Sequence, residues 1–213
     1  VELLSACRKA GVNKFVFASS SAAYGTAENL PTTEEEPKNP SSPYGLQKLA
    51  CEMFMQQFSQ LYGLDTIGLR FFNVYGPGCT GDNPYATAIA AWCDRLSKGL
   101  PLRSDGDGEK TRDMVFVTDV AEALMCAARF SKTGFSYYNV ATGSAISNNA
   151  ILELLRGQVG EFEVTHAPER KGDVKHTLAS IEKIQKELSW SPQYSFEEGL
   201  AETLTWWKLL DVD

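Results

Sequence analysis

The fold class follows from one run, Lys14-Phe15-Val16-Phe17-Ala18-Ser19-Ser20-Ser21, in which an apolar segment leads directly into three hydroxyl side chains. A short, continuous apolar run of this kind is typical of a parallel strand that is buried on both faces. In open α/β sheets, ligands bind beyond the carboxyl ends of such strands. The three serines are therefore predicted to lie at a ligand site, although a serine run also caps helices or fills loops.

A second run, Ser41-Ser42-Pro43-Tyr44-Gly45-Leu46-Gln47-Lys48, predicts the start of a helix that carries a general base. Either serine can serve as the N-cap, and Pro43 suits the first helical position. Four-residue spacing places Tyr44 and Lys48 on one face of the helix, and a cation held near a phenol favours the basic phenolate form. The alternative interpretation is a packing tyrosine beside a solvated lysine.

The rest of the chain alternates helical and strand patterns, which favours a parallel sheet. Helices are predicted near residues 1–10, 43–61, 85–98, 118–131, 147–156, 180–188 and 196–209, and strands near 13–18, 65–72, 114–117, 137–141 and 161–166. The acidic run Thr33-Glu34-Glu35-Glu36-Pro37 is interpreted as a solvated loop.

Gly76-Pro77-Gly78-Cys79-Thr80-Gly81 fits the G-x-G-x-x-G pattern of dinucleotide sites but lacks the context that the pattern needs. A helix must open inside that fingerprint so that free N–H groups face the phosphates. Pro77 removes one such N–H group, and Asp82-Asn83-Pro84 delays the next helix. The run is therefore predicted not to hold a dinucleotide.

Composition agrees with an α/β protein, because 43% of the 213 residues are hydrophobic, 22% are charged and the formal net charge is -7. An acidic chain does not invite nucleic acid, and it must gather positive charge locally to hold a diphosphate. No apolar run approaches the roughly 20 residues of a membrane span, so no membrane partner and a cytoplasmic location are expected. The five scattered cysteines are expected to be reduced thiols, and His166 and His176 are too isolated to predict a metal site.

Five ordered motifs together resemble the extended short-chain dehydrogenase/reductases, specifically the sugar-nucleotide epimerases of the UDP-galactose and UDP-N-acetylglucosamine 4-epimerase type. The motifs are Phe17-Ala18-Ser19-Ser20-Ser21, the Tyr44/Lys48 pair, Leu69-Arg70-Phe71-Phe72-Asn73-Val74-Tyr75-Gly76-Pro77, Gly106-Asp107-Gly108-Glu109-Lys110-Thr111-Arg112-Asp113 and Arg170-Lys171-Gly172-Asp173-Val174-Lys175-His176. The resemblance covers essentially the whole chain. In the family, the loop at residues 76–81 lies on the substrate side.

The resemblance implies the C-terminal part of a Rossmann-type, doubly wound parallel sheet with a smaller α/β substrate-binding lobe. Residues 1–75 would form a partial NAD-binding domain. Residues 76–213 would form mainly the nucleotide-sugar lobe, with some segments returning to the Rossmann sheet. The Gly-rich turn that opens the family has no counterpart before Ser20, so the chain is interpreted as an N-terminally truncated fragment.

The implied reaction is NAD-dependent epimerisation at C4 of a UDP-sugar through a 4-keto intermediate. Tyr44 would take the proton from the sugar 4-hydroxyl, Lys48 would tune that base, and Ser20 would hydrogen-bond the same oxygen. The implied cofactor contacts are Ser19, Ser20, Tyr44, Lys48 and Phe72. For Phe72, an ordinary place in the core is the alternative.

The implied substrate contacts are Asn73, Arg112, Arg170, Asp173 and Thr177. The planar fork of an arginine suits phosphate oxygens, and a carboxylate suits ribose hydroxyls. The alternative for Arg112 is a salt bridge with Asp113. Thr177 matches the family's size gate and should leave room for a 2-acetamido group, so UDP-GlcNAc/UDP-GalNAc is as open as UDP-Glc/UDP-Gal, with a UDP-uronate also possible.

Other functions remain open at this point. Dehydratases and decarboxylases of the same family usually carry a glutamate two positions after the catalytic hydroxyl, where this chain has Ala22. A truncated relative without cofactor would bind a UDP-sugar and turn nothing over. The helix with Tyr44 usually packs between subunits in the family, so a homodimer is expected. Its outer stripe, which could equally be intramolecular core, comprises Met53, Phe54, Phe58 and Leu61.

Overall fold

The computed structural model describes residues 1–81, 87–169 and 174–210. Its central layer is a parallel sheet with the strand order β1 (Lys14–Ser20), β2 (Asp65–Phe71) and β6 (Phe135–Val140). The register places Ser20 opposite Phe71, so β1 and β2 end at the same edge of the sheet. The predicted strand at residues 13–18 is confirmed as parallel.

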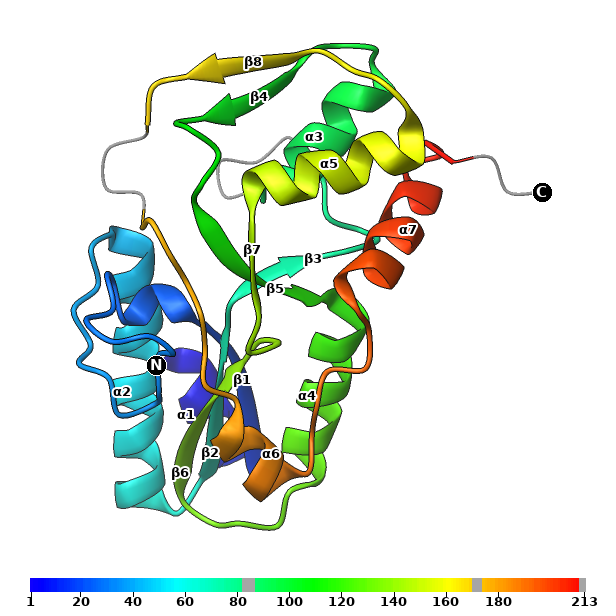
Figure 1. The fold of residues 1–213 in the computed structure, drawn as a ribbon. Helices are drawn as coiled ribbons and strands as arrows, with labels where there is room; N and C mark the ends of the chain where they lie inside the picture. The colour runs from blue at the N-terminus through cyan, green and yellow to red at the C-terminus, as the bar shows by residue number, and fades with distance from the viewer. Residues whose placement is uncertain (82–86, 170–173, 211–213) are drawn as a thin grey trace.

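Helices cover both faces of this sheet, as Figure 1 shows. On one face lie α1 (Glu2–Lys9) and α2 (Pro43–Tyr62), and on the other lies α4 (Val117–Arg129). Phe15 and Phe17 pack toward α1 and α2, whereas Val16 packs toward α4, because successive strand residues point to opposite faces. The layered arrangement confirms the expected α/β fold. All three of these β1 side chains are only half-buried.

The helix α2 begins and ends as its sequence predicts. Ser42 is the N-cap, and its hydroxyl accepts a hydrogen bond from the backbone N–H of Gly45 at 3.1 Å. Pro43 occupies the first turn, where the N–H group that it lacks would have no partner within the helix. Gly63 ends the helix in the left-handed conformation, with φ of 69°.

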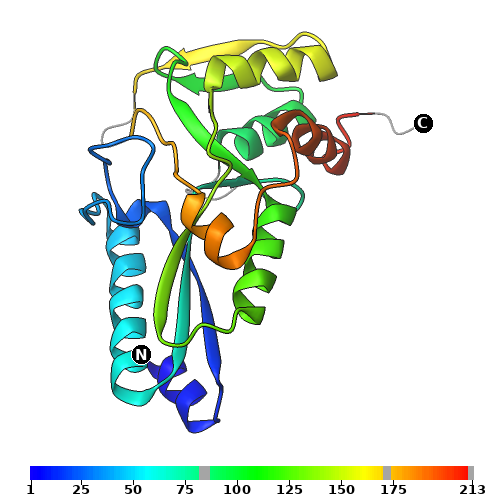
Figure 2. The same ribbon diagram turned by 60° about the horizontal axis from the view of Figure 1, so that its bottom comes forward.

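The second half of the chain adds two small sheets at the carboxyl end of the central sheet. One contains β3 (Asn73–Tyr75), β5 (Thr111–Phe116) and β7 (Ala145–Ser147), with β3 parallel and β7 antiparallel to β5. The other pairs β4 (Leu102–Asp105) with β8 (Val164–Ala167) in parallel. Figure 2 shows the β4–β8 pair at the opposite end of the molecule from α1.

Three helices surround the core of this second half, namely α3 (Ala88–Ser97), α5 (Asn148–Val159) and α7 (Phe196–Trp206). A shorter helix, α6 (Glu182–Leu188), packs instead on the central sheet beside α4. Because β6 and α6 also belong to the central layer, the chain crosses between the two halves more than once (Figure 1).

Every predicted helix has a counterpart in the structure, whereas three strands within the described residues were not predicted. These are β3, β4 and β7, of three or four residues each, and such strands are too short to show a period. The strand predicted at residues 161–166 lies at Val164–Ala167. The glycine-rich run at residues 76–81 follows β3 as a turn, and the next described helix is α3, which begins only at Ala88.

The interpretation of the acidic run as a solvated loop is wrong. Glu34 is 4% exposed and Glu36 is 6% exposed. A carboxylate oxygen of Glu34 accepts the backbone N–H of Asn139 in β6 at 2.9 Å, and one of Glu36 accepts the N–H groups of Glu28 and Asn29. The buried backbone N–H of Asn139 needs an acceptor, which Glu34 supplies, and Glu36 binds two N–H groups of its own loop.

No helix within the described ranges has the length and apolar character that crossing a bilayer requires. Within the same ranges, no three His, Cys, Asp or Glu side chains gather as a metal site would require. All five cysteines are free thiols.

Candidate active site

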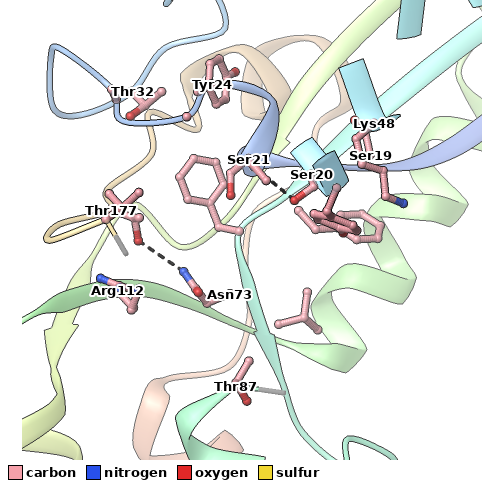
Figure 3. A pocket seen from close by; sticks show the side chains of 18 of the residues that line it. Ser19, Ser20, Ser21, Tyr24, Thr32, Lys48, Asn73, Thr87, Arg112 and Thr177 are labelled. Atoms are coloured by element: carbon pink, nitrogen blue, oxygen red, sulfur yellow. Dashed lines mark hydrogen bonds between the residues drawn. The ribbon is translucent and has the colours of Figure 1, made fainter. Parts of the chain in front are cut away.

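A cavity of about 450 Å³ opens where β1 and β2 end (Figure 3). Its walls come from the β1 end with η1 (Ser21–Ala23), the start of α2, the β2–β3 junction, Arg112 in β5 and the segment 174–177. The predicted site residues that line it are Ser19, Ser20, Tyr44, Lys48, Phe72, Asn73, Arg112 and Thr177. The fold thus gathers residues from both halves of the chain around one space.

Ser20 ends β1 and at the same time caps the short helix η1. Its hydroxyl oxygen accepts the backbone N–H of Ala22 at 3.2 Å, which holds the side chain at the cavity wall. Ser19 points elsewhere, because it is 2% exposed and its hydroxyl donates to Oε1 of Glu52 at 2.6 Å. The predicted contact between Ser19 and a cofactor stays a prediction.

Tyr44 and Lys48 lie on the same face of α2, as their spacing predicts, and both line the cavity. The Lys48 ammonium lies 5.6 Å from the centroid of the Tyr44 ring. It also donates to the carbonyl oxygen of Ala18 at 2.7 Å and lies 5.0 Å from the centre of the Phe17 ring. These contacts hold the partly exposed Lys48 side chain against β1.

Asn73 and Thr177 face the serine and lysine across the cavity (Figure 3). Nδ2 of Asn73 donates to the hydroxyl of Thr177 and to the carbonyl oxygen of Asp113, both at 3.3 Å. A backbone carbonyl only accepts, so the nitrogen of the carboxamide must lie on that side. The hydroxyl of Thr177 also accepts the N–H of Asp113 at 3.2 Å, which fixes its rotamer.

Arg112 also lines the cavity, and its guanidinium group is held by backbone oxygens. Its Nη1 donates to the carbonyls of Thr111 at 2.9 Å and Lys175 at 3.1 Å. The carboxylate of the neighbouring Asp113 is fully buried and accepts three backbone N–H groups and one hydroxyl, from Thr142, Gly143 and Ala179. Burial raises the pKa of Asp113, and those hydrogen bonds partly oppose the rise.

Phe72 belongs to a small core cluster with Tyr24, Ala141 and Ala179, and it is 8% exposed. Since the same side chain also lines the cavity, the core interpretation holds and the contact with a nicotinamide remains a prediction. His176 lines the cavity too, with Nδ1 3.0 Å from the hydroxyl of Thr111. The predicted substrate contacts Arg170 and Asp173 lie outside the described residues.

The charge of the cavity is positive although the protein is acidic. Among the described residues that line it, Lys48 and Arg112 carry positive charge, and none is an aspartate or a glutamate. Such a space attracts an anionic ligand and gives the planar fork of an arginine access to phosphate oxygens. None of the described lining residues has a carboxyl group that would serve as an acid or base beside Ser20.

The sequence interpretation missed a charged group buried next to the cavity. Glu52 and Arg70 are 3% and 1% exposed and form a bidentate pair, with distances of 2.9 Å and 2.5 Å. One signal was available, because Glu52 follows Lys48 at the same four-residue spacing that joins Tyr44 to Lys48. No pattern within the chain identifies Arg70 as the partner, since that contact is made by the fold.

Comparison with known proteins places this geometry among nucleotide-sugar enzymes. The chain is similar to the UDP-N-acetylglucosamine 4-epimerase from Methanobrevibacter ruminantium M1 in complex with UDP-N-acetylmuramic acid. The TM-score is 0.92 and the sequence identity is 36%, and the match covers 97% of this chain and 66% of that chain. It is also similar to the UDP-glucose 4-epimerase from Thermotoga maritima with UDP-glucose, with a TM-score of 0.90, 35% identity, and 97% and 67% covered.

A curated relative is the UDP-glucose 4-epimerase of Mycolicibacterium smegmatis, which is 35% identical over 98% of this chain and 66% of that protein. The chain thus spans about two thirds of the length of the relatives it matches. The family described as "NAD dependent epimerase/dehydratase family" matches residues 1–141. With its parallel sheet, its Tyr44/Lys48 pair and its serine at one cavity, this chain belongs to the NAD-dependent epimerase/dehydratase family.

Proposed function

We propose that the protein to which this chain belongs epimerises a UDP-sugar at C4, using NAD and passing through a 4-keto intermediate. The observation that carries the proposal is the cavity itself, where Ser20, Tyr44 and Lys48 face Asn73 and Arg112 without a carboxyl group among its described lining. Proton transfer at a hydroxyl needs a base and a hydrogen-bond donor at the same oxygen. Elimination of water would need a further acid or base, which supports epimerisation over dehydration.

Tyr44 acts as the base in this proposal. Its phenolate accepts the proton of the sugar 4-hydroxyl, and the positive charge of Lys48 near the ring favours that phenolate. Ser20 donates its hydroxyl hydrogen to the same sugar oxygen while its own oxygen still accepts from Ala22. On reduction of the keto group, the proton returns from Tyr44 to the oxygen at C4.

The residues from β1, α2 and the β2–β3 junction that line this side of the cavity fit the nicotinamide end of NAD. Lys48 offers an ammonium group at the cavity, and Phe72 offers an aromatic face there. Bound NAD would supply the acceptor for the hydride from C4 and the donor for its return. We infer that Ser19, Ser20, Tyr44, Lys48 and Phe72 form this part of the cofactor site, within a Rossmann-type, doubly wound domain at residues 1–75.

The substrate is held from the other wall. Arg112 presents a guanidinium group whose plane is set by two carbonyl oxygens, which suits a diphosphate. Asn73 contributes the oxygen of its carboxamide, because the nitrogen is committed to Thr177 and Asp113. Inversion at C4 requires the sugar to turn while its nucleotide stays bound, and contacts concentrated on the diphosphate permit this. Arg170 and Asp173 complete the proposed substrate contacts in residues 76–213.

The proposed assembly is a homodimer that pairs α2 with its copy. Met53, Phe54 and Leu61 are 61%, 46% and 67% exposed on this helix, whereas Phe58 is buried in the core against α1. Three large apolar side chains in contact with water on one helix favour a partner surface. Sedimentation velocity distinguishes a monomer from a dimer, and a monomer at micromolar concentration would contradict the proposed homodimer.

The function is tested first by the molecules that the protein carries. The purified protein is denatured, and the released small molecules are separated by liquid chromatography and identified by mass. We expect NAD, together with a UDP-sugar that names the substrate. Incubation with that UDP-sugar should then give its C4 epimer. A product lacking the elements of water, or no conversion with NAD present, would contradict the proposal.

A further inference from the structure

We propose that Glu52, paired with Arg70, is the positioning residue that sets Tyr44 and Lys48 in place against Ser20. This inference rests on the proposed function. It assigns a role to the two buried charged side chains, Glu52 and Arg70, which take no direct part in the proposed reaction. Tyr44, Lys48 and Glu52 follow one another at four-residue intervals on α2, so they share one face of the helix. The first two reach the cavity, and the third reaches the sheet.

The carboxylate of Glu52 joins the helix to two neighbouring strands. Its Oε1 accepts the hydroxyl of Ser19 at 2.6 Å and Nε of Arg70 at 2.9 Å, and its Oε2 accepts Nη2 of Arg70 at 2.5 Å. Ser19 and Arg70 are register partners in β1 and β2. One side chain of α2 is therefore bonded at the register position directly before Ser20.

Arg70 extends the same network to the far side of Ser20. Its guanidinium carbon lies 4.6 Å from the ring centre of Tyr24 and 4.2 Å from that of Tyr137. Tyr24 follows η1 and lines the cavity, and its hydroxyl donates to Oδ1 of Asn139 at 2.7 Å. The Glu52–Arg70 pair thus contacts the residue before Ser20 and the residue that closes the turn after it.

The chemistry of this pair suits positioning better than stability. The free energy lost when two charged groups leave water offsets most of their mutual attraction. Apolar residues of similar volume can therefore often replace a buried ion pair without loss of the fold. A bidentate pair does, however, accept one geometry only. Since Glu52 lies one helical turn beyond Lys48, that geometry fixes both the rotation and the axial position of α2 at the site.

The decisive variant is Glu52→Leu/Arg70→Met, which removes both charges together and leaves Ser19, Ser20, Tyr44 and Lys48 unchanged. The matched control is Met55→Ala, because Met55 is buried on the same helix but packs in the cluster with Leu4 and Phe58. Melting temperatures show that each variant is folded. Site geometry is then read by NMR from the NOE between the ε-methylene protons of Lys48 and the ring of Phe17.

We expect the double variant to fold and to lose this NOE, while Met55→Ala keeps it. In an epimerase assay, kcat of the double variant should fall about 100-fold, the effect of a misplacement near 1 Å. KM for the UDP-sugar should stay within about threefold, because the groups on the opposite wall are unchanged. A folded double variant with the native NOE and native kcat overturns the proposal, and so does an equal loss in Met55→Ala.

A second variant covers the case in which the double variant does not fold. Glu52→Gln keeps the shape and one acceptor for Ser19 but places an amide against Arg70, so a weakened NOE and an intermediate kcat are expected. An unchanged NOE and kcat in Glu52→Gln would also overturn the proposal. A wild-type protein that shows the NOE but no epimerisation would contradict the proposed function alone, because the NMR comparison needs no turnover.

Discussion

Gly45 on α2 lies against Ala22 in η1 so closely that a Cβ atom built on Gly45 would overlap the carbonyl oxygen of Ala22. Gly45 is buried and directly follows Tyr44, and Ala22 lies two residues after Ser20. The missing side chain therefore sets how near the helix with the proposed base comes to the turn with the serine. A helix interior otherwise disfavours glycine by roughly 0.5–1 kcal/mol relative to alanine.

Gly45→Ala should push the start of α2 away from η1. The opposing atom belongs to the backbone, so the strain should lower the free energy of unfolding by about 1–3 kcal/mol, as overpacking does. It should also lower kcat. The control is Gly157→Ala in α5, where a Cβ meets nothing within 4 Å. Thermal unfolding should show that the control is neutral or stabilised, and equal destabilisation of both variants would contradict the close approach.

Tyr44→Phe should abolish most of the proposed epimerase activity. Loss of a general base typically costs about 10²–10⁴-fold in rate. The aromatic ring remains, so the melting temperature should change little. Tyr62→Phe removes the same hydroxyl from the exposed end of the same helix and serves as the control. Steady-state rates on the identified UDP-sugar decide the matter, and a Tyr44→Phe rate within about tenfold of wild type would assign the base elsewhere.

Thr177→Tyr should narrow the cavity and act selectively on substrate size. We expect kcat/KM for UDP-GlcNAc to fall by at least about tenfold more than for UDP-glucose, a difference near 1.4 kcal/mol. The variant also removes a hydroxyl that binds Asn73 and the backbone of Asp113. Thr177→Val separates the two effects, because it loses the hydroxyl and keeps the size. Equal loss on both substrates in Thr177→Tyr would contradict the size gate.

Much of this arrangement could be predicted from sequence, and the successes share a physical cause. The helix start at Ser42 and Pro43, and the face shared by Tyr44 and Lys48, depend on contacts within a few residues. The strand at residues 14–20 shows itself by its apolar run. Such local rules place the proposed base and serine before any tertiary structure is known.

The features that could not be predicted from the sequence depend on contacts between residues that are far apart in the chain. Glu34 looks like a solvated charge until β6 brings the backbone of Asn139 to it. Nothing near Arg70 in the sequence identifies Glu52 as its partner, because the fold alone brings α2 and β2 together. The role of Gly45 depends likewise on a carbonyl from another element. Whether a charged side chain is buried depends on which segments of the chain pack together. The spacing of residues within one segment does not indicate this.

Glu34→Gln should stabilise the protein at neutral pH. Burial raises the pKa of Glu34, so its folded-state pKa exceeds the unfolded value. The stability that this group contributes is therefore complete below the unfolded pKa, near 4.5, and is lost as pH rises through the folded pKa. A neutral glutamine avoids that loss and can still accept the N–H of Asn139.

The measurement is thermal unfolding of wild type and Glu34→Gln at pH 7 and pH 4. We expect the variant to melt higher at pH 7, by about 2–4 °C for each kcal/mol gained, and the gap to close at pH 4. Glu35→Gln, which changes an exposed neighbour, is the control and should melt like wild type at pH 7. A variant that melts lower than wild type at pH 7 would mean that the carboxylate is favoured by the fold.

Asp113→Asn should be strongly destabilising although it is nearly isosteric. Each carboxylate oxygen of Asp113 accepts two donors, so the NH₂ group of asparagine must face donors at either position. An unsatisfied buried donor costs about 1–3 kcal/mol. Asp94→Asn breaks an exposed i,i+4 pair with Lys98 and should cost little. Denaturant unfolding compares the two, and similar midpoints would contradict the assigned hydrogen bonds.

Thr32 joins the loop after Tyr24 to the segment near Thr177, since its N–H donates to the carbonyl of Leu178 and its carbonyl accepts the N–H of Ser180. The loop that flanks the serine therefore gains these backbone partners only from a segment made much later by the ribosome. A nascent chain that has already formed β1, α2 and β2 still presents an unfinished pocket. We therefore expect the proposed nucleotide-sugar binding to require the segment around residues 178–180, and the pocket to be completed as a late step of folding.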